Sequence, residues 1–304
     1  MLQIHPEICE ALAKKYPVVA LETTIITHGL PYPKNLATAQ LLEQCVREEG
    51  AIPATIGVVD GKLKVGFSQQ ELVSLASTKG EKLQARYLAW AVALGLSGGT
   101  TVSATMHIAQ LAGIQVFATG GIGGVHREAE RTFDISEDLT ALANTPVAVV
   151  SAGAKAILDL PLTLEKLETL GVPVLGYQTS EFPAFYTRSS GLTIPAVASV
   201  EDMAAILHTA WETLHTTTGF LICNPPPRQV ELPAAQVEGF IQQALAAARQ
   251  AKITGKALTP FLLSHLEQAS GGTTVATNVA LVESNARVAA KIAKALCRLK
   301  GGIL

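Results

Sequence analysis

The stretch from Phe117 to Lys155 constrains the fold more than any other part of the chain. Two short apolar runs, one ending at Ala118 and the other at Val150, each lead directly into small residues followed by polar ones. Four glycines stand between positions 120 and 124, and glycine allows tight turns and a close approach of the backbone to a ligand. Because ligands of α/β proteins bind at the carboxyl ends of such strands, the stretch predicts an α/β fold with a ligand site there.

Short apolar runs and helical segments alternate along the rest of the chain. Further strands are predicted at Val18–Leu21, Val174–Tyr177 and Phe220–Cys223, and Ile52–Val65 has β character around the turn Asp60–Gly61. Helices are predicted at about Asn35–Glu49, Val102–Ala112, Leu164–Leu170, Ser199–His215, Pro233–Ala251, Thr259–Gln268 and Asn278–Leu299. We find no internal repeat or low-complexity linker, so the pattern favours one large α/β domain with a helical C-terminal part.

Local signals predict how individual helices begin. Ser68–Glu71 has the pattern of a capping box, in which a serine and a glutamate each bond a free backbone N–H group. Asn35 is a candidate N-cap for the helix that follows it. Gly98–Thr101 stands before the helix that begins at Val102, where free amides and the helix dipole suit an anion such as phosphate. His107 lies inside that helix and is expected to be a core histidine.

Composition argues against several classes of protein. The chain has 304 residues, 48% of them hydrophobic, and a net charge of -2, so bulk charge gives no reason to expect nucleic acid or membrane binding. The longest apolar run, roughly Leu88–Leu96, is far shorter than the ~18 residues of a membrane span. The N-terminus lacks the pattern of a secretory signal. The four cysteines are widely spaced with no CxxC pair, which is typical of reduced thiols in a cytoplasmic protein.

Two residues that follow predicted strands are candidates for chemistry. Glu22 has apolar neighbours on both sides, and buried carboxylates are rare without a partner; the alternative is a surface glutamate on an edge strand. Lys155 follows a run of small residues, and burial can lower a lysine pKa from about 10.4 toward neutrality. A neutral amine can form a Schiff base with a sugar aldehyde. The alternative is a surface lysine on the first turn of a helix, which the helix dipole disfavours.

The acidic cluster between Asp134 and Asp138 has two interpretations. Hard carboxylate oxygens favour Mg²⁺ or Mn²⁺ over Zn²⁺, so the cluster is a candidate metal site. Asp134 or Ser136 could equally be the N-cap of a helix. The pattern alone leaves both open.

Well-known nucleotide and hydrolase motifs are incomplete in this sequence. Gly121 and Gly123 lack the third glycine of a dinucleotide-binding fingerprint, because His126 stands in its place. Gly255–Lys256 is followed by Ala257, where a Walker loop requires serine or threonine. The sequence has no HExxH motif and no nucleophile elbow.

Seven blocks spread over nearly the whole chain carry a family resemblance. The long block FATGGIGGVHREAERTFDISEDL is highly specific, and the others are VALETTIITHGLPYP, GAIPATIGVVDGKLKVG, GGTTVSATM, SAGAKAILDL, GVPVLGYQT and TPFLL. These blocks resemble the pseudouridine-5′-phosphate glycosidases, a family that also contains the indigoidine synthase A-like proteins.

The resemblance implies both a reaction and an architecture. It implies reversible cleavage of the C–C bond between uracil and ribose 5-phosphate, with a divalent metal that is usually Mn²⁺ and otherwise an ion such as Mg²⁺. It also implies a single three-layer α/β/α domain over residues 1–304 with a central, mostly parallel or mixed sheet, and a homotrimer.

The resemblance also implies roles for individual residues. Glu22 resembles the family's proton donor, Lys155 its Schiff-base lysine and Asp134 its metal ligand. The residues that resemble substrate contacts are Lys82, the backbone at Val102, Ser136, Glu137 and Asp138. Thr119, His126 and Asn278 match further pocket positions.

One segment departs from the family pattern. Gln84–Leu88 replaces the run Ser-Arg-Arg-Asp-Leu that commonly follows the lysine at Lys82, so one arginine and the aspartate are absent. Two other functions therefore stay open: a Schiff-base lyase or aldolase on another sugar phosphate, and a non-catalytic nucleotide-binding protein. Retention of both Glu22 and Lys155 argues against the non-catalytic alternative.

Overall fold

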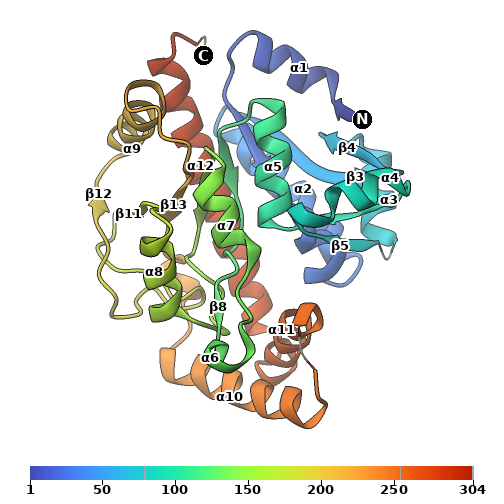
Figure 1. Cartoon of the computed structure of the whole chain (residues 1–304), viewed down its shortest axis with the longest axis vertical. Helices are drawn as coiled ribbons and strands as arrows, with labels where there is room; N and C mark the ends of the chain where they lie inside the picture. Colours follow the sequence, from blue (N-terminus) through green and yellow to red (C-terminus); the bar gives the residue numbers. More distant parts are fainter. Residues whose placement is uncertain (79, 254, 303–304) are drawn as a thin grey trace.

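A central sheet with helices on both of its faces forms the body of the protein (Figure 1). The computed structural model describes residues 1–78, 80–253 and 255–302. The sheet has 11 strands, of which nine form the path β1-β4-β3-β2-β7-β9-β13-β11-β12, while β6 pairs with β3 and β5 pairs with β6. Pairs from β3 through β2 to β12 are parallel, and β3 is antiparallel to β4 and β6. The expectation of a mostly parallel or mixed sheet is confirmed.

The strands of this sheet are short. They are β1 (Leu2–Ile4), β2 (Val18–Leu21), β3 (Ile52–Val59), β4 (Lys62–Val65), β5 (Glu81–Leu83), β6 (Gly98–Thr100), β7 (Val116–Ala118), β9 (Ala148–Ser151), β11 (Val174–Tyr177), β12 (Ala196–Val197) and β13 (Phe220–Cys223). A separate pair joins β8 (Val125–His126) to β10 (Leu158–Asp159). All residues of β2, β7, β9 and β13 are buried, because helices cover both faces, and this accounts for their unbroken apolar sequences.

The helices divide into two layers and a C-terminal extension. Figure 1 shows α5 and α7 in front of the sheet and α12 behind it, where α12 also packs against α2 and α9. The helices are α1 (Pro6–Ala13), α2 (Lys34–Glu48), α3 (Gln69–Ser77), α4 (Leu88–Ala93), α5 (Val102–Ala112), α6 (Ala129–Thr132), α7 (Glu137–Asn144), α8 (Leu160–Thr169), α9 (Val200–His208), α10 (Ala234–Gln250), α11 (Leu258–Ala269) and α12 (Thr273–Leu299). Short helical turns are η1 (Ile25–Gly29), η2 (Ala85–Tyr87), η3 (Thr209–Thr213), η4 (Arg228–Val230) and η5 (Gly255–Ala257).

Several local predictions are confirmed and two are wrong. Ser68 and Glu71 form the predicted capping box, and Ser136 caps α7 by accepting a hydrogen bond from the Asp138 N–H. Asn35 is not an N-cap: it lies inside α2, and its side-chain amide donates to the Ile26 and Ala76 carbonyls. His107 is exposed rather than in the core, because it lies on the outer side of α5.

Two further differences concern the extent of helices. Helix α12 begins at Thr273, five residues before the predicted start at Asn278. The predicted helix from Ser199 to His215 is interrupted, since α9 changes at Thr209 into the wider turn η3. No helix among the described residues is long and apolar enough to cross a membrane.

Candidate active site

A cavity of about 620 Å³ opens at the carboxyl ends of three neighbouring strands. Strand β2 leads into Glu22, β7 leads into Thr119, and the loop after β9 carries Lys155. These strands are parallel and adjacent in the order β2-β7-β9, so their carboxyl ends meet at one edge of the sheet. Residues far apart in sequence therefore line one space, as the sequence predicts.

Glu22 lies in this cavity with its side chain held by Thr119. The Thr119 hydroxyl donates a short hydrogen bond to Glu22 Oε1. Burial raises the pKa of the Glu22 carboxyl above its ordinary value, although Lys155 and the bond from Thr119 oppose the shift. The surroundings thus favour the protonated form of Glu22 more than water would, and the protonated form is the one that a general acid needs.

The Lys155 loop is fastened to the glycine loop after β7. Ala152 N–H donates to the Gly120 carbonyl at 2.9 Å, and Lys155 N–H donates to the Ile122 carbonyl at 3.1 Å. Gly153 has a φ of 79°, and a Cβ there would lie 2.4 Å from the Pro183 carbonyl oxygen. Lys155 itself lies in this loop and not on a helix. The alternative of a surface lysine on the first turn of a helix is therefore wrong.

Lys82 faces the same cavity from β5. Burial lowers its pKa, and the ammonium group of Lys155 lowers it further. The N-terminus of α5 also reaches the cavity through Thr101 and Val102, and the Thr101 side chain makes no capping hydrogen bond. A helix N-terminus beside a lysine is a suitable place for a phosphate group.

Asp138 ties two walls of the cavity together. Its carboxylate accepts hydrogen bonds from the Ser103 N–H at 3.0 Å and from the Gly123 N–H at 2.8 Å. A Cβ at Gly123 would lie 2.2 Å from the Ser136 hydroxyl oxygen, so this approach requires glycine. Asp138 and Ser136 both line the cavity, and Asp138 also fixes the start of α5 against the glycine loop.

His126 and Asp134 lie together on another wall. The His126 N–H donates to the Asp134 carbonyl at 3.0 Å, and burial lowers the pKa of the His126 imidazole although Asp134 opposes the shift. Among the described residues, no group of three or more His, Cys, Asp and Glu side chains could hold a metal ion. The Asp134 carboxylate lines the cavity without a hydrogen bond or ion pair to any described residue. One carboxylate suits Mg²⁺ or Mn²⁺, which commonly keep water and substrate oxygens as their other ligands.

Most of the predicted site residues line the cavity. They are Glu22, Lys82, Val102, Thr119, His126, Asp134, Ser136, Asp138, Lys155 and Asn278. Glu137 is not among the lining residues, and its carboxylate accepts a hydrogen bond from the Arg86 N–H at 3.1 Å. Its direct contact with a substrate stays a prediction. Asn278 belongs to α12, which is anchored nearby because Asn285 Nδ2 donates to the Thr119 carbonyl at 2.8 Å.

Other lining residues were not predicted from the sequence. Thr24 lies two residues after Glu22, and its hydroxyl is buried without a hydrogen-bond partner among the described residues. Phe185 comes from the segment between β11 and β12. Helix α11 supplies Thr259, Pro260 and Leu263. The block TPFLL contains these three residues, so the family resemblance of this block could have indicated that they lie at the site.

Comparison with protein families gives one match over most of the chain. The model of the family described as indigoidine synthase A like protein matches residues 7–295. Among curated proteins, the pseudouridine-5′-phosphate glycosidase of Caldanaerobacter subterraneus subsp. tengcongensis is 53% identical over 301 residues, covering 98% of this chain and 97% of the relative. The pseudouridine-5′-phosphate glycosidase of Solibacter usitatus is 54% identical over 294 residues, covering 96% and 98%.

Solved structures agree with the sequence comparison. The crystal structure of the prealnumycin C-glycosynthase AlnA in complex with ribulose 5-phosphate is 42% identical, with a TM-score of 0.92 over 99% of this chain and 98% of the other. An indigoidine synthase A-like protein from Thermotoga maritima is 34% identical, with a TM-score of 0.90 over 98% and 97%. The fold and the arrangement of the chain are therefore shared with both proteins.

Proposed function

The chain belongs to the indigoidine synthase A-like family, and from that premise we propose that it reversibly cleaves the C–C glycosidic bond of pseudouridine 5′-phosphate. The products are uracil and ribose 5-phosphate. The observation that carries the proposal is the single cavity in which Glu22, Lys82 and Lys155 meet. The names and the identity of the curated relatives support the substrate.

A C-glycoside poses a specific chemical problem. The anomeric carbon is joined to a ring carbon, so no heteroatom of the base can accept the bonding electrons. Opening the ribose ring and attaching an amine to C1′ solves this problem, because the nitrogen lone pair can form an imine as the C–C bond breaks. An enzyme with this mechanism needs one nucleophilic lysine and at least one protonated carboxyl group.

The residues of the cavity suit these steps. Glu22 protonates the ring oxygen as the C1′–O bond breaks, and Lys155 forms a bond to C1′. The nitrogen of Lys155 loses a proton to water, and a carboxylic acid or water protonates C5 of the uracil ring. The Lys155 nitrogen then supplies the electron pair of the imine, while the electrons of the C1′–C5 bond re-form the C5–C6 double bond of uracil. Water hydrolyses the imine and releases ribose 5-phosphate and the free lysine.

Phosphate recognition is assigned to the part of the cavity that contains Lys82 and the start of α5. Lys82 and the N-terminus of α5 at Val102 offer a positive charge and backbone donors to a phosphate group. The replacement of the family's Ser-Arg-Arg-Asp-Leu run affects this wall, where Gln84 and Arg86 now line the cavity. The Arg86 guanidinium donates to Gln84 Oε1 at 2.5 Å and lies over the Tyr87 ring.

A divalent cation is the proposed cofactor. Asp134 would hold Mn²⁺ or Mg²⁺, and the bound ion would supply positive charge for the phosphate or sugar oxygens. The open carboxylate of Asp134 supports this assignment.

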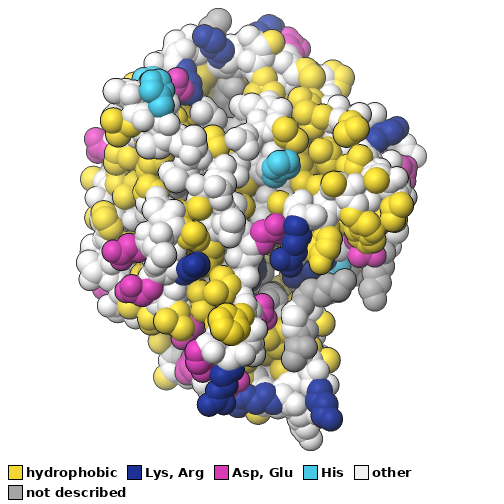
Figure 2. All heavy atoms as spheres, viewed as in Figure 1, with side chains coloured by type: hydrophobic (Ala, Val, Ile, Leu, Met, Phe, Trp, Pro, Cys, Tyr) yellow, Lys and Arg dark blue, Asp and Glu magenta, His cyan; other side chains and the backbone are white. Residues whose placement is uncertain are grey.

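The assembly and the compartment are proposals that depend on the family and the surface. We propose a homotrimer, and the exposed apolar stripe of Tyr87, Trp90 and Leu94 along η2 and α4 is a suitable contact surface. Figure 2 shows hydrophobic side chains gathered at the right of this face, where Figure 1 places α3 and α4. We also propose a cytoplasmic location, which the free thiols of the four cysteines support.

A second candidate differs in the sugar or in its acceptor. The related crystal structure names a C-glycosynthase with ribulose 5-phosphate, which favours considering another sugar phosphate or another aromatic acceptor. The same Lys155 chemistry would serve both candidates.

One assay separates the two candidates. The protein is incubated with uracil, ribose 5-phosphate and Mn²⁺, and the products are identified by mass spectrometry. Pseudouridine 5′-phosphate should form with the wild type, and Glu22→Gln should lose most of this turnover. No product with uracil, but a product with another acceptor or with ribulose 5-phosphate, would replace the first candidate by the second.

A further inference from the structure

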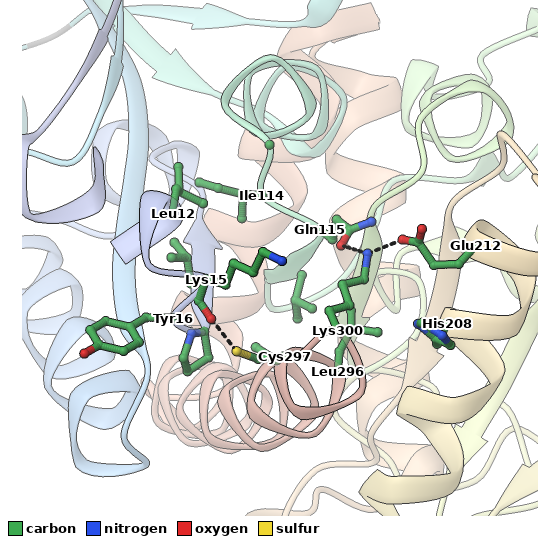
Figure 3. Close-up of a pocket in the computed structure, with 15 residues that line it drawn as sticks. Leu12, Lys15, Tyr16, Ile114, Gln115, His208, Glu212, Leu296, Cys297 and Lys300 are labelled. Atoms are coloured by element: carbon green, nitrogen blue, oxygen red, sulfur yellow. Dashed lines mark hydrogen bonds and ion pairs between the residues drawn. The ribbon is translucent and has the colours of Figure 1, made fainter. Parts of the chain in front are cut away.

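A second cavity, of about 480 Å³, lies at the opposite edge of the sheet from the active site (Figure 3). It is bounded by the residues that begin β2 and β7, Val18 and Val116, whereas the active site follows their carboxyl ends. The segments just before β2 and β7, residues 15–17 and 113–115, supply about half of the remaining wall, and α1, α9, η3, α12 and Lys300 supply the rest. None of its lining residues lines the active-site cavity.

The wall of this cavity combines an apolar surface with an excess of positive charge. Leu12, Ile114 and Leu296 supply apolar surface, and Lys15 and Lys300 supply two ammonium groups against the single carboxylate of Glu212. Lys300 Nζ lies 2.9 Å from the side-chain oxygen of Gln115 and forms an ion pair with Glu212. This contact lowers the pKa of the Glu212 carboxyl, which therefore remains ionised and neutralises one of the two lysines.

Lys15 is an exposed residue and the second lysine of the cavity wall. Its ammonium group makes no hydrogen bond or ion pair with any residue in the described part of the chain. Figure 3 shows the side chain pointing into the cavity while Tyr16 turns away from it. The backbone at Lys15 has a φ of 54°, and its carbonyl accepts a hydrogen bond from the Cys297 thiol at 2.6 Å. A left-handed conformation is uncommon for a residue other than glycine, and here it directs a lysine into a cavity.

His208 also lines the cavity, on the side formed by α9. Its Nδ1 has no hydrogen-bond partner within the described residues, but this atom is buried away from the open space of the cavity, so a bound molecule would not pair with it.

We propose that this cavity binds a small organic anion, with its apolar body against Leu12, Ile114 and Leu296 and its carboxylate or phosphate at Lys15. The volume lies in the range of about 300–1,000 Å³ that is usual for small-molecule sites. A charge-assisted hydrogen bond from Lys15 orients the anionic end, because the charge of Lys300 is already paired with Glu212. The proposal does not depend on the function assigned to the active site, because the two cavities share no lining residue.

Titration calorimetry with three small probes tests the site. Benzoate and phenyl phosphate carry an apolar ring and an anionic group, and benzyl alcohol has the ring without the charge. The two anions should bind, and benzyl alcohol should not. The anion that binds with the higher affinity shows whether the site prefers a carboxylate or a phosphate. Equal binding of the charged and neutral probes would overturn the proposal.

Variants of the cavity provide the matched comparison. Lys15→Asn removes the charge and introduces a residue that tolerates the left-handed conformation. The affinity for the preferred anion should fall at least about tenfold. Lys14→Asn removes the neighbouring charge, which pairs with Glu10 outside the cavity, and should bind as the wild type does. Glu212→Gln removes the carboxylate that competes for Lys300, so this variant should bind the anion more tightly than the wild type does. Its affinity therefore changes in the opposite direction to that of Lys15→Asn.

Binding at the active site is separated by a further variant. Lys82→Ala removes the lysine assigned to phosphate there and should leave benzoate affinity unchanged. Lys15→Asn should retain catalytic activity, which shows that it is folded. The proposal would be overturned if Lys82→Ala lost affinity for the probes while Lys15→Asn and Glu212→Gln kept it. The probes would then occupy the active site.

Discussion

At the scale of single residues, the proposed chemistry depends on side chains placed in unusual surroundings. Glu22 accepts a hydrogen bond from Thr119 and has a raised pKa because it is buried, and Lys82 has a lowered pKa for the same reason. Water would solvate both charged groups better than the cavity does, so this placement does not serve stability. Such perturbed groups in a cleft are typical of a functional site.

The raised pKa of Glu22 predicts how stability changes with pH. The folded protein binds the Glu22 proton more tightly than the unfolded chain, whose carboxyl has the ordinary value of 4.5. The stabilisation from this proton is complete below that pH and is lost as the pH rises through the folded-state pKa. Glu22→Gln stays neutral, so its Tm should exceed that of the wild type at alkaline pH, and the difference should shrink toward pH 4.5.

Thermal melting across this pH range measures the effect. Glu165→Gln, on the exposed surface of α8, is the control and should leave the Tm unchanged. If Glu22→Gln melts below the wild type at alkaline pH, Glu22 stabilises the fold as an anion, and the proton-donor assignment loses its physical basis.

Asp134 is the residue that tests the proposed cation. Excess chelator should abolish activity, and Mn²⁺ or Mg²⁺ should restore it. Asp134→Ala should be inactive with or without added metal while its Tm stays close to that of the wild type, because the carboxylate makes no hydrogen bond or ion pair with the described residues. Glu130→Ala, on the exposed surface of α6, should keep its activity. Full activity in excess chelator would remove the metal from the account.

At the scale of secondary-structure elements, local sequence patterns predict the turns and helix caps that depend on neighbouring residues. The turn Asp60–Gly61 and the capping box at Ser68 are confirmed, since each depends on residues within a few positions. The prediction that Asn35 is an N-cap was wrong. Its side-chain amide bonds to the carbonyls of Ile26 and Ala76, and Ala76 is 41 residues away in sequence. Contacts of that range depend on how elements pack, which a local pattern does not contain.

The glycine loop makes a prediction for one element. Gly123→Ala should push Ser136 and Asp138 away, because its Cβ would lie 2.2 Å from Ser136 Oγ. The strain should cost about 1–3 kcal/mol of stability and most of the activity. Gly239→Ala is the control: Gly239 lies within α10 with no atom near its Cβ position, so alanine should raise stability by roughly 0.5–1 kcal/mol.

Denaturant unfolding and turnover measure both variants together. A Gly123→Ala protein as stable and active as the wild type would show that the Asp138 contacts do not hold the cavity in shape.

At the scale of the whole molecule, the chemistry depends on the order of the strands. The sequence predicts individual strands, but it does not state that β7 lies between β2 and β9, because strand pairing depends on the packed helices as well. The family resemblance supplied the missing information about which residues share a site. A single domain over residues 1–304 stays a prediction, which the continuous hydrophobic core from Ile8 to Leu296 supports.

The exposed stripe along α4 makes a prediction about assembly. Leu94 is 63% exposed and does not line the active site, so Leu94→Asp should break the proposed trimer without touching the cavity. Leu214→Asp, at a residue that is 67% exposed beyond η3, should leave the trimer intact. Sedimentation velocity distinguishes the two, and a wild type that sediments as a single chain would contradict the trimer.

The most direct test of the proposed chemistry is reductive trapping of the imine. The protein is mixed with ribose 5-phosphate, treated with borohydride and mapped by peptide mass spectrometry. A stable adduct of one sugar phosphate should form on Lys155. Lys155→Ala and Lys155→Arg should show no adduct and no cleavage, the latter because arginine stays charged. Lys82→Ala should still be trapped at high sugar concentration. An adduct on Lys82, or turnover by Lys155→Ala, would contradict the roles given to the two lysines.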